Sequence, residues 1–400
     1  MNFQIPIGPQ HPALKEPIGL RVVVEGEIIR DADLRLGYNH RGIEKLAESK
    51  TWIQNIYLEE RICGICSHSH TTCYVQGVEK LMEIQPPKRG LYIRTLVAEL
   101  ERIHSHLLWL GVAGHEAGFD SFFMYVWRDR EIVMDILETI SGNRVHYANN
   151  TIGGVRRDLD ELQVKHILDS LEILRKRSEF YKNLGTKEPS FVARLAGVGY
   201  LSKEDAITLC AVGPTLRASG VPMDVRKDDP YAVYDEVPFE VCTADTCDVL
   251  GRTVVRIKEI LESYNIIEFL LKNLPAGPIA VRAPRRPKPN EVISRYEAPR
   301  GELIYYIKSN GTEKPERIKV RAPTLGNYAA TIKMLKKGFI ADVPLIFAAI
   351  DPCIACAERA VAIVDARTGQ EKVVPMNILR QSSQKKSANK ERKREVEWPL

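Results

Sequence analysis

The sequence predicts an α+β fold, in which a central multi-helix bundle is flanked by small β-rich segments at the N-terminus and in the C-terminal third. Three observations predict it. Apolar residues recur at helical spacing through several long segments in the middle of the chain. Short links join these segments, which is typical of an antiparallel bundle. Alternating runs bounded by turn residues occur near both ends, as expected for short strands.

The first fifty residues are predicted to be β-rich. Strands are expected over residues 3–7, 20–29 and 32–36, with turns near Gly26 or Asp31. A loop over residues 8–17 follows the first strand, and its three prolines make it stiff because each fixes φ and lacks an N–H donor. His11 and Glu16 lie in this loop, and the residues alone favour a solvated surface position for both.

Residues 51–277 are predicted to form the helical bundle. The clearest helix covers residues 91–110, where Ile93, Leu96, Val97 and Leu100 share one face. A further helix is expected to open at Ser202 with a capping box. The remaining helices are expected up to about residue 54 and over residues 74–82, 121–141, 158–184 and 247–274.

Residues 278–338 are predicted to be β-rich again. A Pro/Arg-rich connector over 278–289 precedes a hairpin of residues 303–308 and 317–320, and a short helix over 327–338 follows. Residues 339–359 are predicted to form a metal-binding segment, and residues 1–359 are predicted to make one domain. Residues 360–400 are a C-terminal extension. It holds a hairpin of residues 360–364 and 371–374, and a charged tail that is expected to be disordered from residue 381.

Composition excludes several classes of protein. Hydrophobic residues make up 44% and charged residues 27% of the 400 residues, as in ordinary soluble domains. The net charge of +5 comes partly from residues 385–394, and no basic face interleaved with aromatics supports nucleic-acid binding. The longest clean apolar run, residues 343–350, is too short to span a bilayer. No export signal is visible, so the eight cysteines indicate a reducing compartment.

Two Cys-x-x-Cys pairs lie near opposite ends of the chain. Cys63 and Cys66 form one, and Cys353 and Cys356 the other. Four thiolates suit zinc, an iron–sulfur cluster or another thiophilic metal. Because a zinc ribbon spaces its pairs by only about 15–20 residues, this separation favours a site at the heart of a large domain. The other four cysteines are interpreted as structural: Cys73, Cys210, Cys242 and Cys247.

The flanks of both pairs resemble a known family. Residues 61–68, RICGICSH, resemble the first nickel-binding signature of [NiFe]-hydrogenase large subunits, and residues 351–359, DPCIACAER, are similar to the second. Residues 297–303 and 321–324 resemble the segments around the family's active-site iron. Residues 8–12 and 99–111 are similar to the quinone-site large subunit of respiratory complex I. Both sets occur together in energy-converting, membrane-bound hydrogenases.

The resemblance implies a Ni–Fe(CO)(CN)2 centre. Cys63 and Cys353 match terminal nickel ligands, and Cys66 and Cys356 match the ligands that bridge nickel to iron. Cys353 also matches a terminal thiolate that accepts a proton. Arg300 is expected to place its guanidinium over the open face of the metals, where a fixed planar cation can donate to cyanide nitrogens and polarise H2.

Other roles follow from the same resemblance. Glu16 matches the glutamate that passes protons away from a terminal cysteine, because burial can raise the pKa of a carboxyl. Pro323 and Thr324 match residues that line the diatomic ligands. His68 and His11 are expected to donate hydrogen bonds to the ligand shell.

Two further features match the family less completely. Glu44 matches a ligand of a second metal, Mg or Fe, but Arg359 stands where that metal's histidine is expected. Family members are often cut after the residue matching Arg359 once nickel is bound. Residues 360–400 are therefore either a removed maturation peptide or a retained extension.

The sequence thus predicts a catalytic large subunit that reduces protons to H2. It has no Fe–S cluster of its own, so electrons are expected from ferredoxin through a partner [4Fe–4S] small subunit. Further hydrophilic subunits and an ion-pumping membrane arm are implied. No nucleic acid is expected as a partner. The chain itself would lie peripherally on the cytoplasmic face of the cell membrane.

Three alternatives stay open. A related oxidoreductase subunit could reduce a sulfur compound or quinone, although complex I subunits lack the cysteine pairs. The four cysteines could instead hold a structural zinc in a scaffold subunit. The chain could also be a non-enzymatic assembly module. Nickel content, CO and CN infrared bands, and H2 evolution that depends on these cysteines distinguish the alternatives.

Overall fold

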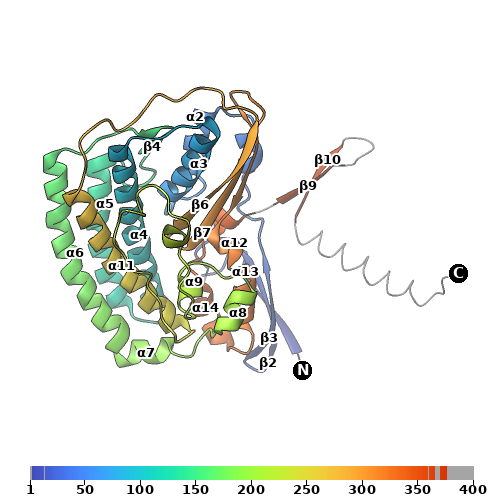
Figure 1. Ribbon diagram of the computed structural model, residues 1–400. Helices are drawn as coiled ribbons and strands as arrows, with labels where there is room; N and C mark the ends of the chain where they lie inside the picture. Colours follow the sequence, from blue (N-terminus) through green and yellow to red (C-terminus); the bar gives the residue numbers. More distant parts are fainter. Residues whose placement is uncertain (1, 13, 359, 365–369, 376–400) are drawn as a thin grey trace, which may run out of the picture.

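A computed structural model describes every residue except 1, 13, 359, 365–369 and 376–400. Long helices form one side of the molecule, and a three-stranded sheet lies against them on the other, as Figure 1 shows. The order of the elements confirms the predicted α+β architecture, with small antiparallel sheets near the N-terminus and in the C-terminal third.

The N-terminal sheet is an antiparallel meander of β1 (Asn2–Ile7), β2 (Gly19–Glu25) and β3 (Ile28–Arg35). The alternating burial of β2 matches a strand with one face on the core. The turn lies at Gly26, whose φ of 61° suits a residue without a Cβ. The expectation of a strand that reaches residue 29 and of a turn at Asp31 is wrong, because β3 runs through Asp31.

Four long helices make the bundle: α4 (Lys88–Glu116), α5 (Asp120–Ser141), α6 (Glu161–Lys187) and α11 (Val249–Lys272). They bury one large apolar cluster that includes Leu100, Leu137 and Ile260. Helix α4 is longer than predicted. Its C-terminal part packs closely on α5, and a Cβ at Gly111 would lie 2.4 Å from the Trp127 ring.

Three helices precede the bundle: α1 (Ile43–Ala47), α2 (Trp52–Glu60) and α3 (Ser67–Met82). The single helix predicted up to residue 54 is divided, because Thr51 caps α2 and forms a capping box with Gln54. Helix α3 begins at Ser67, directly after Cys66, rather than at residue 74. This earlier start places the first cysteine pair at the N-terminus of a buried helix.

The second sheet has the order β6 (Asn290–Ala298), β7 (Gly301–Ser309) and β8 (Pro315–Arg321). The hairpin of β7 and β8 confirms the prediction, whereas β6 was not expected. Charged residues interrupt β6 and leave no clean alternation, which explains why the sequence pattern misses it. Helix α3 packs on β6 and β7 and buries a second apolar cluster that contains all four cysteines of the two pairs.

Short elements complete the chain. The predicted capping box at Ser202 is only half formed, since the Ser202 hydroxyl accepts from the Asp205 N–H to open α8 (Lys203–Thr208). The other short helices are α7 (Pro189–Leu195), α9 (Pro214–Arg217), α10 (Val225–Asp228), α12 (Pro323–Gly326), α13 (Tyr328–Leu335), η1 (Ile340–Asp342), α14 (Val343–Ala349) and α15 (Ile354–Ala357). The short strand pairs are β4 (Asn150–Thr151) with β5 (Gly154–Val155), and β9 (Ala360–Val364) with β10 (Glu371–Pro375).

The last strand pair agrees with the hairpin predicted after residue 359, while the predicted disordered tail lies outside the described residues.

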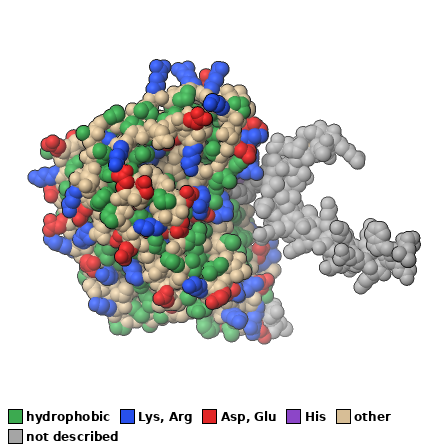
Figure 2. All heavy atoms as spheres, in the orientation of Figure 1, with side chains coloured by type: hydrophobic (Ala, Val, Ile, Leu, Met, Phe, Trp, Pro, Cys, Tyr) green, Lys and Arg blue, Asp and Glu red, His purple; other side chains and the backbone are tan. Residues whose placement is uncertain are grey.

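Within the described part, no helix combines the length and apolarity needed to cross a bilayer. Figure 2 shows basic and acidic side chains interspersed over the face in view, without a continuous basic patch.

Candidate metal centre

The two cysteine pairs meet in the fold. The sulfur atoms of Cys63, Cys66, Cys353 and Cys356 all lie within 4.8 Å of one another, and all four residues are buried. Cys353 Sγ is 3.3 Å from Cys63 Sγ and 2.8 Å from Cys356 Sγ, and Cys66 Sγ is 3.7 Å from Cys356 Sγ. This convergence is the geometry that a thiolate-bound metal requires.

Local backbone structure points the sulfurs inward. Cys66 is the N-cap of α3 and Cys353 the N-cap of α15, so the first pair ends at the start of a helix and the second pair straddles one. The guanidinium of Arg41 donates to the carbonyl oxygens of Arg61 at 2.8 Å and Ile62 at 2.7 Å. It also reaches the Ala355 carbonyl at 3.4 Å, and therefore ties the two cysteine segments together.

The four thiols are electrostatically unequal. Hydrogen bonds from Cys353, Cys356 and Cys66 hold the pKa of Cys63 well below its usual range. Burial raises the pKa of Cys356 well above its usual value. A set of close thiols in which one proton is lost easily and the others are retained is poised to release protons when a cation binds.

A cavity of about 520 Å³ opens beside the cysteines. Cys63 and Cys353 line it, whereas Cys66 and Cys356 are absent from its wall. A structural zinc site is closed by its ligands, while a catalytic metal site keeps an open position. The cavity thus gives this thiol set an open side, and that side belongs to the two cysteines that match terminal nickel ligands.

Arg300 and Asp351 form a buried ion pair in the cavity wall. Arg300 donates through Nη2 to the Asp351 carboxylate at 2.8 Å and through Nε to the Asp351 carbonyl at 2.8 Å. Burial opposes the charge, but Asp351 and the cysteines hold the pKa of Arg300 well above its usual value. Arg300 stands at the β6–β7 corner, where Gly301 has a φ of 125° and a Cβ would lie 2.7 Å from Gly213 N.

Glu16 reaches the site from the loop between β1 and β2. Its carboxylate accepts hydrogen bonds from the amides of Ile354 and Ala355, the latter at 3.1 Å, and it lines the cavity. Burial raises the pKa of Glu16. The loop is therefore not merely solvated surface at this residue, and the carboxyl stands where it can exchange protons with the cavity.

Thr324 also contacts the second pair directly. The Cys353 amide donates to the Thr324 hydroxyl at 3.0 Å, and Pro323 is the first residue of α12 before it. Neither residue is part of the cavity wall. Thr324 and Pro323 therefore lie beside Cys353 in the candidate metal site, but on the side away from the cavity.

Two predicted residues lie elsewhere. His11 is exposed and is not part of the cavity wall. Glu44 accepts from the Val320 amide at 3.0 Å and lies 3.6 Å from Arg317. Among the described residues, the four cysteines are the only group of three or more His, Cys, Asp or Glu side chains with converging ligand atoms, so Glu44 has no such cluster around it.

His70, not His68, contacts the thiols. His70 Nε2 is 3.4 Å from Cys356 Sγ. His68 Nε2 instead lies 2.9 Å from the Arg94 carbonyl, and its Nδ1 lies 3.3 Å from the Asn150 amide. The start of α3 is the signal that could have identified His70. In a helix that begins at Ser67, residue 70 lies one turn after Cys66 and therefore on the same side of the helix.

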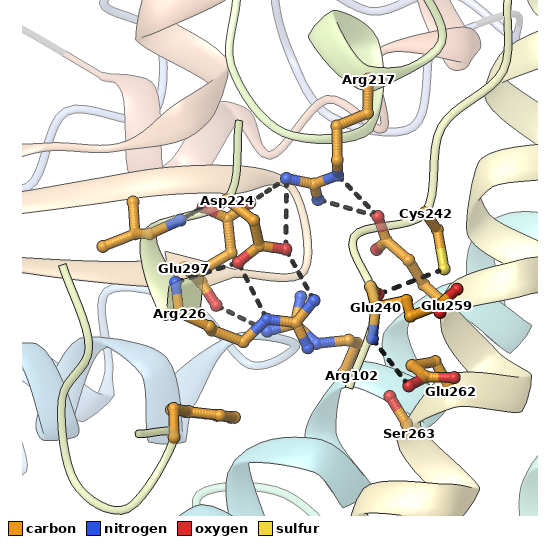
Figure 3. Close-up of polar contacts among 12 residues, drawn as sticks. Arg102, Arg217, Asp224, Arg226, Glu240, Cys242, Glu259, Glu262, Ser263 and Glu297 are labelled. Atoms are coloured by element: carbon orange, nitrogen blue, oxygen red, sulfur yellow. Dashed lines mark hydrogen bonds and ion pairs between the residues drawn. The ribbon is translucent and has the colours of Figure 1, made fainter. Parts of the chain in front are cut away.

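A fully buried ion network includes Glu297, close to the end of the strand that leads to Arg300. Arg217 sits between Glu297 on β6 and Glu259 on α11, with contacts of 2.8 Å to each carboxylate (Figure 3). Arg226 pairs with Asp224 at 2.7 Å. The network joins the bundle to the sheet just before the corner that carries Arg300, and so holds that corner in place.

Comparisons with known proteins agree with this geometry. A model described as respiratory-chain NADH dehydrogenase, 49 Kd subunit, matches residues 116–290 and 281–359, and a nickel-dependent hydrogenase model matches residues 41–111. The carbon monoxide-induced hydrogenase of Rhodospirillum rubrum is 42% identical over 90% of this chain and 99% of its own length. The chain belongs to the family of energy-converting hydrogenase and complex I-like large subunits.

Other members of the family also match along most of this chain. The membrane-bound hydrogenase subunit alpha of Pyrococcus furiosus is 42% identical and covers 90% of this chain and 88% of its own. A chain of the membrane-bound sulfane sulfur reductase, an archaeal respiratory membrane complex, superposes with a TM-score of 0.85 at 32% identity, over 90% of this chain and 98% of its own. Family members thus serve as subunits of multi-subunit membrane complexes with different reactions.

Proposed function

We propose that this chain is the catalytic large subunit of a membrane-associated, energy-converting [NiFe]-hydrogenase. The main support for this proposal is the open four-thiol site, in which two cysteines face a cavity with Arg300 and Glu16 in its wall. The relatives named as hydrogenases support this assignment. The reaction is 2H⁺ + 2e⁻ → H2.

The four cysteines would hold the nickel and iron, with Cys63 and Cys353 on the open side. When bound, the centre supplies the redox chemistry that interconverts protons and H2. Arg300 keeps a fixed positive charge beside the cavity, and Asp351 sets its orientation through two hydrogen bonds. Glu16 accepts a proton from the cavity and passes it outward, because burial raises the pKa of its carboxyl and so helps it to hold a proton in transit.

The electrons must come from outside the described chain. Among the described residues, one group of cysteines has converging sulfurs, and the proposed centre uses it. We therefore assign electron delivery to a partner subunit with a [4Fe–4S] cluster, with ferredoxin as the donor and an ion-translocating membrane arm. In this arrangement the chain lies on the cytoplasmic face of the membrane.

A second function has its own support. The structural likeness to a chain of sulfane sulfur reductase favours a related subunit that reduces a sulfur compound with the same fold. That reaction needs electrons and protons at the same cavity. The two functions differ in whether the purified complex evolves H2 or reduces polysulfide, so side-by-side assays distinguish them.

Infrared spectroscopy of the purified complex, together with metal analysis, tests the proposal. We expect CO and CN bands, about one nickel per chain, and H2 evolution with reduced ferredoxin. Stoichiometric zinc without those bands would identify a structural zinc subunit instead. H2 evolution that persisted after all four cysteines were replaced would show that this chain is an assembly module.

A further inference from the structure

A chain of four buried side chains leads away from Cys356. His70 Nε2 lies 3.4 Å from Cys356 Sγ, and His70 Nδ1 lies 2.8 Å from the Tyr305 hydroxyl. The Tyr305 hydroxyl in turn lies 2.9 Å from Glu59 Oε2. Cys356, His70, Tyr305 and Glu59 come from α15, α3, β7 and α2, so four separate elements converge on one line of polar contacts.

The number of protons on this line decides which way each hydrogen bond points. If Glu59 is ionised, the Tyr305 O–H donates to it, and the Tyr305 oxygen accepts from Nδ1–H of a neutral His70. His70 Nε2 then has no proton and faces the Cys356 sulfur as an acceptor. That arrangement requires a protonated thiol, which a metal-bound cysteine does not have.

With a neutral His70, a metal-bound thiolate requires the opposite direction. A protonated Glu59 donates to the Tyr305 oxygen, the Tyr305 O–H donates to His70 Nδ1, and His70 Nε2–H donates to Cys356 Sγ. We propose that Glu59 is a positioning residue, kept as a neutral acid, that acts through Tyr305 to fix His70 as a hydrogen-bond donor to the Cys356 thiolate. This inference rests on the proposed function only in requiring a metal on Cys356.

The surroundings of Glu59 favour the neutral acid. Its side chain is fully buried, and within the described structure its Oε1 atom has no hydrogen-bond partner. Burial raises the pKa of Glu59 to about 8, while the Tyr305 hydroxyl opposes this and Glu44 on α1 adds to it. Tyr74 on α3 also interacts electrostatically with Glu59. None of these three neighbours carries positive charge, so none favours the ionised form as a counter-ion would.

The donated hydrogen bond has a consequence for the centre. An N–H donor withdraws charge from a thiolate, and partners of this kind tune the metal that the ligand holds. Without the donor, Cys356 would place more charge on the iron, and the CO band would move to lower frequency. The band position thus reports the donor even when the metals stay bound.

Three variants test the inference in the purified complex. Tyr305→Phe removes the donor to His70 Nδ1, and Glu59→Leu removes the donor that orients the Tyr305 hydroxyl, so we expect both to lower the CO frequency, Tyr305→Phe by more, while nickel stays bound. Glu59→Gln can still donate an amide N–H to Tyr305, so we expect its bands to match the wild type. Tyr74→Phe is the control, because its hydroxyl donates to the Trp52 carbonyl without joining the line.

Nitrogen-15 NMR of histidine-labelled complex reads the His70 tautomer directly and needs no CO or CN ligand. We expect His70 Nε2 to carry the proton and Nδ1 to lack it, with the signal assigned by its loss in His70→Gln. Protonated Nδ1 in the metal-loaded protein would overturn the inference. Glu59→Gln bands shifted as far as those of Glu59→Leu would also overturn it. Wild-type protein without CO and CN bands would contradict the proposed function, while the His70 tautomer would still decide this inference.

Discussion

Cys353 is the thiol on which the proposed centre depends most directly. It lies close to two other thiols, it lines the cavity, and its amide is held by Thr324. A serine hydroxyl is a poorer ligand than a thiolate for nickel, which prefers soft donors. We therefore expect Cys353→Ser to lower the nickel content at least about tenfold and to abolish H2 turnover, as measured by metal analysis and hydrogen evolution.

The matched control for this variant is Cys210→Ser, because Cys210 is an exposed cysteine outside the site. Its nickel content and activity should equal those of the wild type. Full activity in Cys353→Ser would refute the assignment of Cys353 as a ligand.

Glu16 should matter for rate rather than for metal binding. Its carboxylate lies in the cavity wall and accepts from two backbone amides, and glutamine can replace its shape but cannot carry the proton. General acid–base groups contribute about 10²–10⁴ in rate. We expect Glu16→Gln to slow H2 turnover by a factor in this range while nickel stays bound, as measured by initial rates and metal analysis.

Glu116→Gln is the control for proton exit, because Glu116 lines the same cavity but is paired with Lys15 at 2.7 Å. It should retain most of its rate, because Lys15 holds the Glu116 carboxylate as an ion-pair partner and not as a proton carrier. Equal slowing of both variants would show that the effect belongs to cavity charge and not to Glu16.

At the residue level, sequence spacing predicts the sulfur ligands but not their neighbours. The Cys-x-x-Cys pairs and their flanks identify four residues that the fold brings together. Which histidine faces the cysteines depends on where α3 begins. The sequence pattern predicts a start at residue 74, whereas α3 begins at Ser67. His70 was therefore overlooked in favour of His68. The partners Tyr305 and Glu59 are distant in the chain and could be found only in three dimensions.

At the level of elements, the long helices follow from the sequence because their apolar stripes are regular over many turns. Strand β6 does not, since Ile293 is exposed while Ser294 and Glu297 are buried, so its apolar pattern is broken. The short helices α9, α10 and α12 hold Arg217, Arg226 and Thr324 in place, yet each has only four residues. Helices of this length are set by tertiary contacts rather than by local propensity.

The buried ion network should be essential to the junction between bundle and sheet. Arg217→Met would leave Glu259 and Glu297 buried without their shared partner. Removing one member of a buried pair costs about 3–5 kcal/mol, so we expect a loss of this size in the free energy of unfolding, measured with chemical denaturant.

Lys176→Ala is the control for this prediction, because it breaks the exposed Lys176–Glu172 pair on α6. Its cost should stay below about 1 kcal/mol. A similar small cost for Arg217→Met would show that the network relaxes around the missing charge and does not hold the junction.

At the level of the whole molecule, the two cysteine segments, which are distant in the sequence, meet at the site only because several elements carry them there. Helix α12 packs on α15, and Arg41 bridges the two cysteine segments. Hydrophobic periodicity does not encode which distant segments meet, so the resemblance of the flanks was needed to predict it. The predicted roles of these residues stay predictions for experiment.

Buried titratable groups give the whole fold a specific pH response. Burial raises the pKa of both Glu59 and Glu101 to about 8, from an ordinary value of 4.5. Burial lowers the pKa of His68 to about 3 and of His106 to about 4, from 6.5. We therefore expect the free energy of unfolding to fall between about pH 6.5 and 8, as measured by denaturant unfolding at constant metal content.

The sign follows from proton counting in the folded and unfolded chains. Between pH 4.5 and 8 the folded protein holds protons on Glu59 and Glu101 that the unfolded chain has released, so rising pH favours unfolding. The two histidines act in the opposite direction, but only below 6.5, where the unfolded chain takes up protons. Each retained proton contributes a slope approaching 1.4 kcal/mol per pH unit, roughly.

Glu59→Gln removes one of these protons, so the slope of its unfolding free energy between pH 6.5 and 8 should be shallower by about that amount. Identical slopes in wild type and variant would mean that Glu59 is ionised in the folded protein.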